Sequence, residues 1–201
     1  MFEYNNNLKS NIRWRGESGA GFTIIEVLIV IAIIMLFSIV LISNFPEFKL
    51  QSSLSRTAYK FGQDLRKVQA DAFSSAPYVD ANGVSQPIEG YGIYVGLDDP
   101  GQKKYIVYAD KMPGNQRYDT EDYLVATVDI ALDEPGIVIQ NILNSVGNSV
   151  SINFTPPNPL TKISNSLGGE TSRVDIIFAQ ENDISKNKTV SIHSSGLIEV
   201  K

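Results

Sequence analysis

The chain has 201 residues, no cysteine, one histidine and a formal net charge of −5. The lack of cysteine excludes disulfides and thiolate metal sites, and a single histidine argues against a catalytic or metal cluster built on histidine. The acidic balance disfavours nucleic-acid partners, because the phosphate backbone is itself an anion. The length suits one globular domain together with an elongated element.

An apolar run begins soon after the N-terminus. Residues 1–21 are polar, and the run IIEVLIVIAIIMLFSIVLI then extends from Ile24 to Ile42, where only Glu26 and Ser38 interrupt it. As a helix with a rise of about 1.5 Å per residue, it would span roughly 28 Å, close to the hydrocarbon thickness of a bilayer. The run is therefore long enough to cross a membrane.

Two familiar interpretations of this region differ in their fit. A secretory signal peptide has its small-residue cleavage site after the apolar run, whereas the small residues 18–21 precede it here, so that interpretation is poor. A plain membrane anchor agrees with the length and the flanking charges. Lys9, Arg13 and Arg15 precede the run, and no lysine or arginine follows before Lys49. This asymmetry predicts a cytoplasmic leader and a large domain outside the membrane.

Glu26 needs a separate explanation, because a charge deep in a bilayer costs on the order of 3 kcal/mol. A location near the interface, where the charge is tolerated, is one alternative. The sequence GFTIIEV, which begins at Gly21, offers another, since it resembles the processing motif of type IV prepilins and type II secretion pseudopilins. Gly21, Phe22, Glu26 and the following apolar run occupy matching positions. The resemblance implies cleavage after Gly21, N-methylation of Phe22, and pairing of Glu26 with the N-terminal amine of a neighbouring subunit.

The same resemblance implies a structural role. The residue inventory argues against an enzyme, and no cofactor is expected. The expected function is that of a structural subunit of a type IV pilus or a type II secretion pseudopilus, for which a minor subunit is favoured and a major one stays open. Its expected partners are prepilin peptidase, other pilin or pseudopilin subunits and an inner-membrane assembly platform. The subunit would first span the inner membrane once and then enter the filament. The alternative is a single-span anchored extracytoplasmic binding module that does not polymerise.

A second helical pattern follows the apolar run. Pro46 is expected to bend the helix rather than end it, as in many members of the resembling family. Beyond it, apolar residues recur every three or four positions, which predicts a helix from about Thr23 to Phe73 with one face packed against a sheet. The residues of this apolar stripe are Leu50, Leu54, Ala58, Phe61, Leu65, Val68 and Ala72.

From residue 76 onward the pattern changes to short β-like runs separated by turn residues. These runs predict an α+β fold in which a long helix packs on a meandering antiparallel sheet. The resembling family implies that this is the pilin-like fold, and the segments around GYGIYV and VSIHSSGLI are loosely similar to the minor pseudopilin H and fimbrial T group. The predicted strands are Tyr91–Val95, Tyr105–Ala109, Leu124–Ile130, Ile137–Ile142, Val150–Phe154, Val174–Ala179, Thr189–His193 and Leu197–Val200.

Four segments result from these predictions. Residues 1–21 form a cleaved leader, and residues 22–45 form the membrane and filament-core part of the helix. Residues 46–75 form its amphipathic second part, and residues 76–201 form a β-rich extracytoplasmic domain.

Two further sites come from residue chemistry. Some members of the resembling family bind calcium through loop carboxylates, and Asp110, Asp119, Glu121 and Asp122 are weak candidate ligands. Their spacing does not match an EF-hand, so a solvated turn without a metal is the default interpretation. His193 lies in a predicted strand beside two serines. Adjacent residues point in different directions along a strand, so these residues do not form a catalytic triad.

Overall fold

The structure is a computed structural model that describes residues 21–156 and 161–201. Lys9, Arg13 and Arg15, on which the predicted membrane orientation depends, lie outside these ranges. The described chain divides into two compact units, one that ends at Asn44 and one from Phe45 to Lys201. It has an apolar N-terminal helix and antiparallel sheets, so the expected α+β class is confirmed.

Helix α1 extends from Ile24 to Phe73, in close agreement with the expected range. Pro46 lies inside the helix and does not end it, because a proline removes only one backbone donor while the neighbouring turns keep their hydrogen bonds. Ser74 and Ala76 close the C-terminal turn through backbone hydrogen bonds to the carbonyls of Ala70 and Asp71. The chain then enters the strands.

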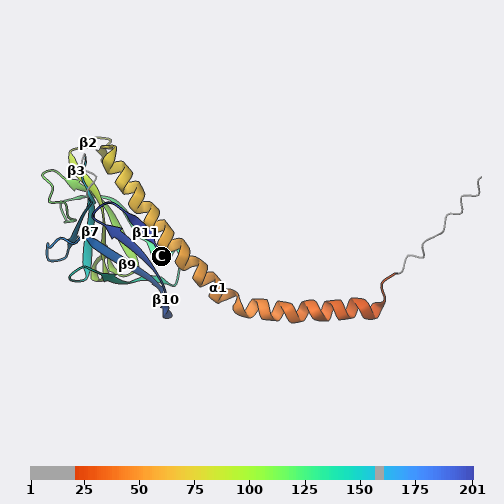
Figure 1. Ribbon diagram of the computed structural model, residues 1–201. Coiled ribbons are helices and arrows are strands. Elements are labelled where there is room, and N and C mark those ends of the chain that lie inside the picture. The colour runs from red at the N-terminus through yellow and green to blue at the C-terminus, as the bar shows by residue number, and fades with distance from the viewer. Residues whose placement is uncertain (1–20, 157–160) are drawn as a thin grey trace, which may run out of the picture. The chain divides into compact units, whose positions relative to one another are not determined.

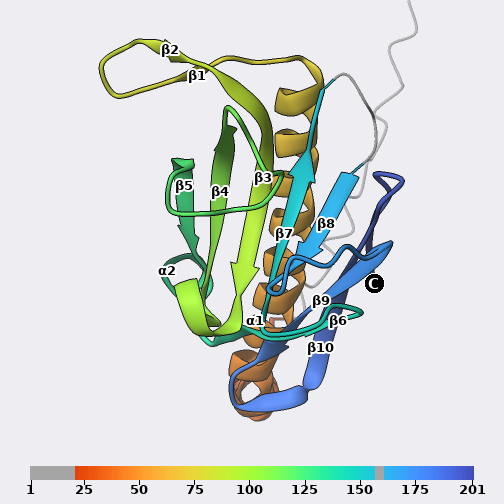
Figure 2. The same cartoon turned by 90° about the vertical axis from the view of Figure 1, so that its left-hand side faces the viewer.

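The strands of the second unit form two large antiparallel sheets and one small ribbon (Figures 1 and 2). The five-stranded sheet, in the order β5-β4-β3-β7-β8, consists of β3 (Ile88–Gly96), β4 (Lys104–Lys111), β5 (Tyr123–Asp129), β7 (Ser149–Phe154) and β8 (Thr161–Asn165). The four-stranded sheet, in the order β11-β10-β9-β6, consists of β6 (Ile137–Leu143), β9 (Arg173–Gln180), β10 (Asp183–His193) and β11 (Ile198–Val200). The remaining elements are β1 (Tyr78–Val79), β2 (Ser85–Gln86), the short turn η1 (Leu97–Gly101) and the helical turn α2 (Ile130–Asp133).

The expectation of one meandering sheet is wrong. Strand β7 follows β6 along the chain but pairs with β3, while β6 pairs with β9 in the other sheet. Ile130 was expected at the end of a strand, but it begins α2, where the Asp129 side chain accepts a hydrogen bond from the Ala131 N–H at 3.0 Å. Strand β8 was also missed, because its sequence TKISN contains a single strongly apolar residue.

The second half of α1 lies behind both sheets in Figure 2, and Phe61 links the helix to each of them. Its fully buried ring lies 5.0 Å from the ring of Tyr105 in β4 and 5.2 Å from that of Phe178 in β9. The predicted apolar stripe is buried except for Leu50, which is half-buried. The two sheets therefore share one core, and α1 is the element common to both.

We expect Phe61→Ala to lower the free energy of unfolding by about 3 to 5 kcal/mol, because the substitution opens a cavity between the two sheets. Urea unfolding followed by circular dichroism measures this change. Tyr59→Ala on the exposed side of the same helix is the matched control and should change stability by less than about 0.5 kcal/mol. Equal effects of the two substitutions would contradict the assignment of Phe61 to the shared core.

Alternation along the strands gives the five-stranded sheet two chemically different faces. Tyr105 and Ile93 point to the core beneath α1. Tyr108 and Asp110, also on β4, point to the opposite side, which we call the outer face. A Cβ at Gly92 would lie 2.4 Å from the Tyr108 ring, so the close packing of Tyr108 on this face requires a glycine there.

Candidate functional site

The start of α1 carries the residues that the sequence singled out. The backbone N–H of Val27 donates to the Thr23 carbonyl, and the backbone N–H of Glu26 donates to Thr23 Oγ1, both at 3.2 Å. Thr23 therefore caps the helix, and Glu26 follows at the third helical position. This Thr-x-x-Glu spacing is that of a capping box. Sequence reasoning missed the role of Thr23, although its spacing from Glu26 was a usable signal.

Gly21 and Phe22 lie in an open environment. A Cβ at Gly21 would meet no atom within 4 Å, and the side chain of Phe22 is 81% exposed. The peptide bond between them is therefore sterically accessible. The carboxylate of Glu26 is exposed too, and it has no hydrogen bond or ion pair within the described part of the chain.

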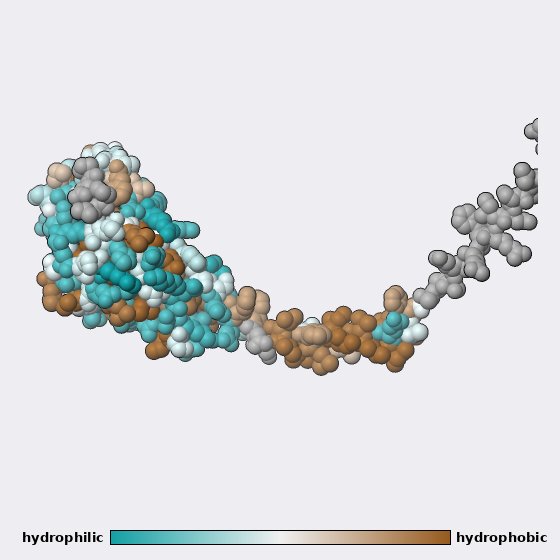
Figure 3. Space-filling model, viewed as in Figure 1, coloured by the Kyte–Doolittle hydropathy of each residue, from teal (hydrophilic) through white to brown (hydrophobic). Residues whose placement is uncertain are grey.

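The segment Ile24–Ile42 is apolar on all sides. It is the one stretch of the described residues that is long and apolar enough to cross a membrane, and none of it is buried within the chain. Figure 3 shows brown, hydrophobic residues over this segment, whereas the surface of the second unit is mostly teal and white. The Ser38 hydroxyl donates to the Ile34 carbonyl at 2.8 Å, so its polar group is satisfied inside the helix. Glu26 is thus the polar group of this segment that needs an external partner.

The four candidate calcium ligands lie at the end of β4 and in the loop that follows it. Three of them accept hydrogen bonds from backbone N–H groups. Asp110 accepts from Gln116 at 2.8 Å, Asp122 from Lys111 at 3.0 Å, and Asp119 from Glu121 at 2.9 Å. Each of these carboxylates therefore has a structural role, because it accepts a hydrogen bond from a backbone N–H of the loop or of its flanking strand.

Within residues 21–156 and 161–201, no group of three or more His, Asp or Glu side chains has an arrangement that could hold a metal ion. Glu89, which sequence reasoning did not include, joins the same region, where it accepts from the Gly114 N–H at 2.7 Å. Calcium binding thus stays a prediction, and a calcium-dependent rise in the melting temperature would test it.

Asp110 is almost fully buried on the outer face. Burial, followed by repulsion from Asp122, raises the pKa of its carboxyl to about 6, while the Gln116 N–H partly opposes that rise. Burial also raises the pKa of Asp122. Between pH 4 and 6 the folded chain therefore holds a proton that the unfolded chain releases, and this difference makes folding less favourable as the pH rises.

We expect Asp110→Asn to remove this pH dependence. The wild-type chain should lose about 1 to 3 kcal/mol of stability relative to the variant as the pH rises from 4 to 7. Asp80→Asn is the control with the opposite sign, because the backbone N–H of Val84 lowers the pKa of Asp80. That variant should lose stability relative to wild type above pH 4. Parallel curves for wild type and Asp110→Asn would contradict the prediction.

His193 ends β10, where its backbone N–H donates to the Leu197 carbonyl at 3.0 Å. Its register partner across the sheet is Arg173 of β9. Arg173 donates to Asp175 at 2.9 Å and to the Ser191 hydroxyl at 3.3 Å. Because Ser191 is fully buried, this polar group stabilises the sheet, whereas Ser194 is half-buried and Ser195 is exposed. The absence of enzymatic activity stays a prediction.

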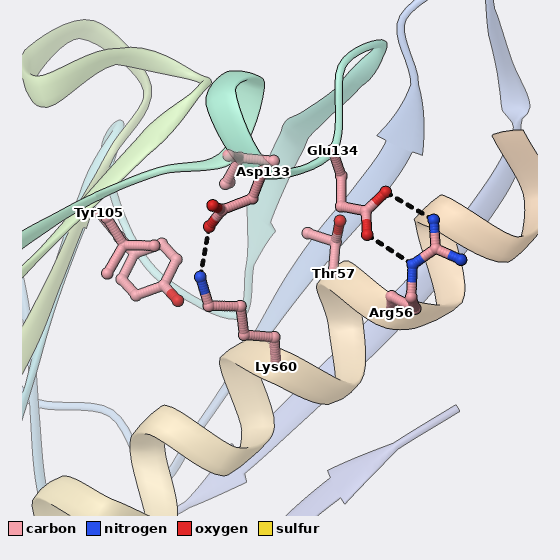
Figure 4. Close-up of a pocket in the computed structure, with 8 residues that line it drawn as sticks. Arg56, Thr57, Lys60, Tyr105, Asp133 and Glu134 are labelled. Carbon is pink, nitrogen blue, oxygen red and sulfur yellow. Dashed lines mark hydrogen bonds and ion pairs between the residues drawn. The ribbon is translucent and has the colours of Figure 1, made fainter.

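A cavity of about 240 Å³ lies between α1, β4, β5 and α2. Figure 4 shows the Arg56 side chain bonded to Glu134 through two hydrogen bonds of 2.5 and 2.8 Å, and Lys60 paired with Asp133. The Tyr105 hydroxyl donates to Asp64 at 2.5 Å. The charged groups that line the cavity therefore satisfy one another, and they fasten α2 to α1.

A scan against protein-family models, a search of curated proteins and a search of solved structures each found no match to this chain.

Proposed function

We propose that this chain is a structural subunit of the type IV pilin or pseudopilin kind, which is cleaved after Gly21 and assembled into a helical filament. The observation that carries the proposal is the segment Ile24–Ile42, which is apolar on every side and is not buried against any part of the chain that the structure describes. A helix that is apolar all round requires a membrane or a bundle of similar helices as its surroundings. Inner-membrane insertion followed by filament assembly provides both in turn.

Glu26 distinguishes this proposal from a plain anchor. Lipid offers its carboxylate no partner, so a permanent anchor tolerates this charge only where Glu26 lies at the membrane interface. Cleavage after Gly21 creates an amine on Phe22, and this amine is a cation at the same end of the apolar helix. Pairing of the Glu26 carboxylate with the amine of a neighbouring subunit neutralises two charges that are expensive to bury separately.

The open surroundings of Gly21 support processing by prepilin peptidase, because the peptide bond can enter a protease site without unfolding of the domain. The hydrogen bond from the Glu26 N–H to Thr23 Oγ1 supports a defined helix start at Ile24, two residues after the new terminus. The β-rich domain would lie outside the cytoplasm and form the filament surface. The inner-membrane assembly platform and other subunits are the proposed partners, and a cytoplasmic ATPase elsewhere in the machine would supply the energy.

Mass spectrometry of the N-terminus of the mature protein tests this function. The proposal expects a chain that begins with N-methylated Phe22. An intact Met1 start throughout the membrane pool would instead support the anchored extracytoplasmic binding module, which needs the same span but neither cleavage nor assembly.

A further inference from the structure

The exposed side of α1 in the second unit carries basic and aromatic side chains. Every basic residue of α1 lies between Lys49 and Lys67, and each of them is exposed. Phe48 and Tyr59 on the same part of the helix are 73% and 53% exposed. We call Phe48, Lys49, Tyr59, Arg66 and Lys67 the helix surface.

Several positive charges of the helix surface lack a carboxylate partner. Lys49 and Lys67 form no ion pair with any described residue, and Arg66 donates only to the Ile198 carbonyl, at 3.2 Å. Arg56 and Lys60, by contrast, are paired with acidic groups of the α2 region. Lys49, Arg66 and Lys67 are therefore available to a partner of opposite charge.

Carboxylates gather on the outer face of the five-stranded sheet, around two tyrosines. The rings of Tyr94 and Tyr118 lie 4.7 Å apart. Burial raises the pKa of the Tyr118 hydroxyl, and the nearby charges of Asp99, Asp122 and Asp119 raise it further, which places these groups close together. We call the set the acidic surface: Tyr94, Asp98, Asp99, Tyr118, Asp119, Glu121 and Asp122.

The carboxylates of the acidic surface form no ion pair with lysine or arginine within the described ranges, although Arg117 lies in the same loop. An open hollow of about 380 Å³, lined in part by Tyr94, Asp98 and Asp99, adjoins the tyrosine rings. A lysine or arginine side chain can enter such a hollow, where carboxylates and aromatic faces both stabilise its charge.

The two surfaces lie on opposite sides of the second unit. Side chains of β4 alternate between the core beneath α1, where Tyr105 meets Phe61, and the outer face with Tyr108 and Asp110. The residues of the helix surface are exposed, whereas Phe61 and Leu65 on the other side of α1 are fully buried in this core. A single copy therefore cannot bring its own two surfaces together.

From this arrangement we infer that the helix surface of one copy docks on the acidic surface of a second copy. Charge complementarity identifies the binding partner as a second copy, because each copy presents both the basic helix surface and the acidic surface. Different patches on the two partners make the contact heterologous, and repetition of such a contact generates a helical series of subunits. The inference rests on the proposed filament function and assigns the contact between its globular domains.

The cysteine-free sequence makes a direct test possible, because introduced cysteines are the only thiols. Gln63→Cys places a thiol beside the helix surface, and Thr120→Cys places one between Asp119 and Glu121 of the acidic surface. Both positions are exposed. The two full-length variants are co-expressed in membranes and oxidised. We expect a disulfide between Gln63→Cys and Thr120→Cys copies, and none between two Gln63→Cys copies.

Charge reversal then tests complementarity. Lys49→Glu with Lys67→Glu in the Gln63→Cys copy should lower cross-linking at least tenfold. Asp99→Lys with Glu121→Lys in the Thr120→Cys copy should do the same. None of these four side chains is in an ion pair of the described chain, although the charge of Lys49 acts on Glu134 at a distance. Both reversals together should restore the yield.

Lys103→Glu with Lys201→Glu is the control for net charge: it lies outside both surfaces, and the exposed ion pairs that it breaks, with Glu181 and Glu199, contribute little to stability. It should leave cross-linking unchanged. An equal loss in this control, a lack of restoration, or disulfides between two Gln63→Cys copies would overturn the contact. Two further measurements on the same variants, the N-terminal residue and the amount of protein in filaments, distinguish failure of this contact from failure of the proposed function. Lys49→Glu/Lys67→Glu chains that begin at methylated Phe22 and enter filaments at wild-type levels would overturn the contact alone.

Discussion

A chain in which Glu26 is replaced by leucine will still be cleaved after Gly21 but will be absent from filaments. Leucine suits the apolar run, so membrane insertion is unaffected or improved. In a bundle, however, the substitution leaves the Phe22 amine of a neighbouring subunit buried without its partner, which costs about 3 to 5 kcal/mol. A cost of that size lowers the association constant at least roughly a hundredfold. Immunoblots of sheared filaments and of membranes measure the distribution.

Two further variants separate charge from helix capping. Glu26→Gln keeps a polar side chain at the third helical position but removes the charge, so it should fail to assemble as Glu26→Leu does. Thr23→Ala removes the oxygen that accepts from the Glu26 N–H, costs the helix start about 1 kcal/mol, and should still assemble. Normal assembly of Glu26→Gln would show that capping, rather than charge pairing, is the role of this position.

Replacement of Gly21 by leucine should abolish cleavage while the folded domain is unchanged. Nothing within 4 Å would contact a Cβ at this position, so a side chain there causes no clash inside the chain. Loss of cleavage would then report failed recognition by the peptidase. Mass spectrometry should find the full-length chain in the membrane and none in filaments, and the melting temperature of the domain should equal that of wild type. Efficient cleavage of the Gly21→Leu chain before Phe22 would contradict the importance of a small residue at the cleavage site.

Much of the helix was predictable from the sequence. Ile24–Phe73 agrees with the expected range, and the apolar stripe from Leu54 to Ala72 is buried as predicted. Periodicity succeeds there because one helix face meets one core, so position along the chain translates directly into burial. Most strands were predictable for a similar reason, since alternating β-branched and aromatic runs mark them locally.

The pairing of the strands was not predictable in the same way. Nothing in Ile137–Leu143 or Ser149–Phe154 reveals that these consecutive strands belong to different sheets. The partner of a strand is selected by packing against distant residues, and Phe61 provides such a centre by contacting both sheets.

The carboxylates after β4 show the same limitation. Sequence indicated oxygen ligands, whereas the fold buries Asp110 and uses its neighbours to accept turn N–H groups.

By itself, the sequence determined that this chain has a long apolar segment with one carboxylate near its start and a glycine before it; cleavage after that glycine stays a prediction. These features are local, because hydropathy, residue size and spacing along one helix are enough to define them. Only the tertiary structure decided which surfaces the domain presents. Strand pairing and core packing place the helix surface and the acidic surface on opposite sides of the second unit. That arrangement depends on contacts between residues far apart in the chain, and no local pattern encodes it.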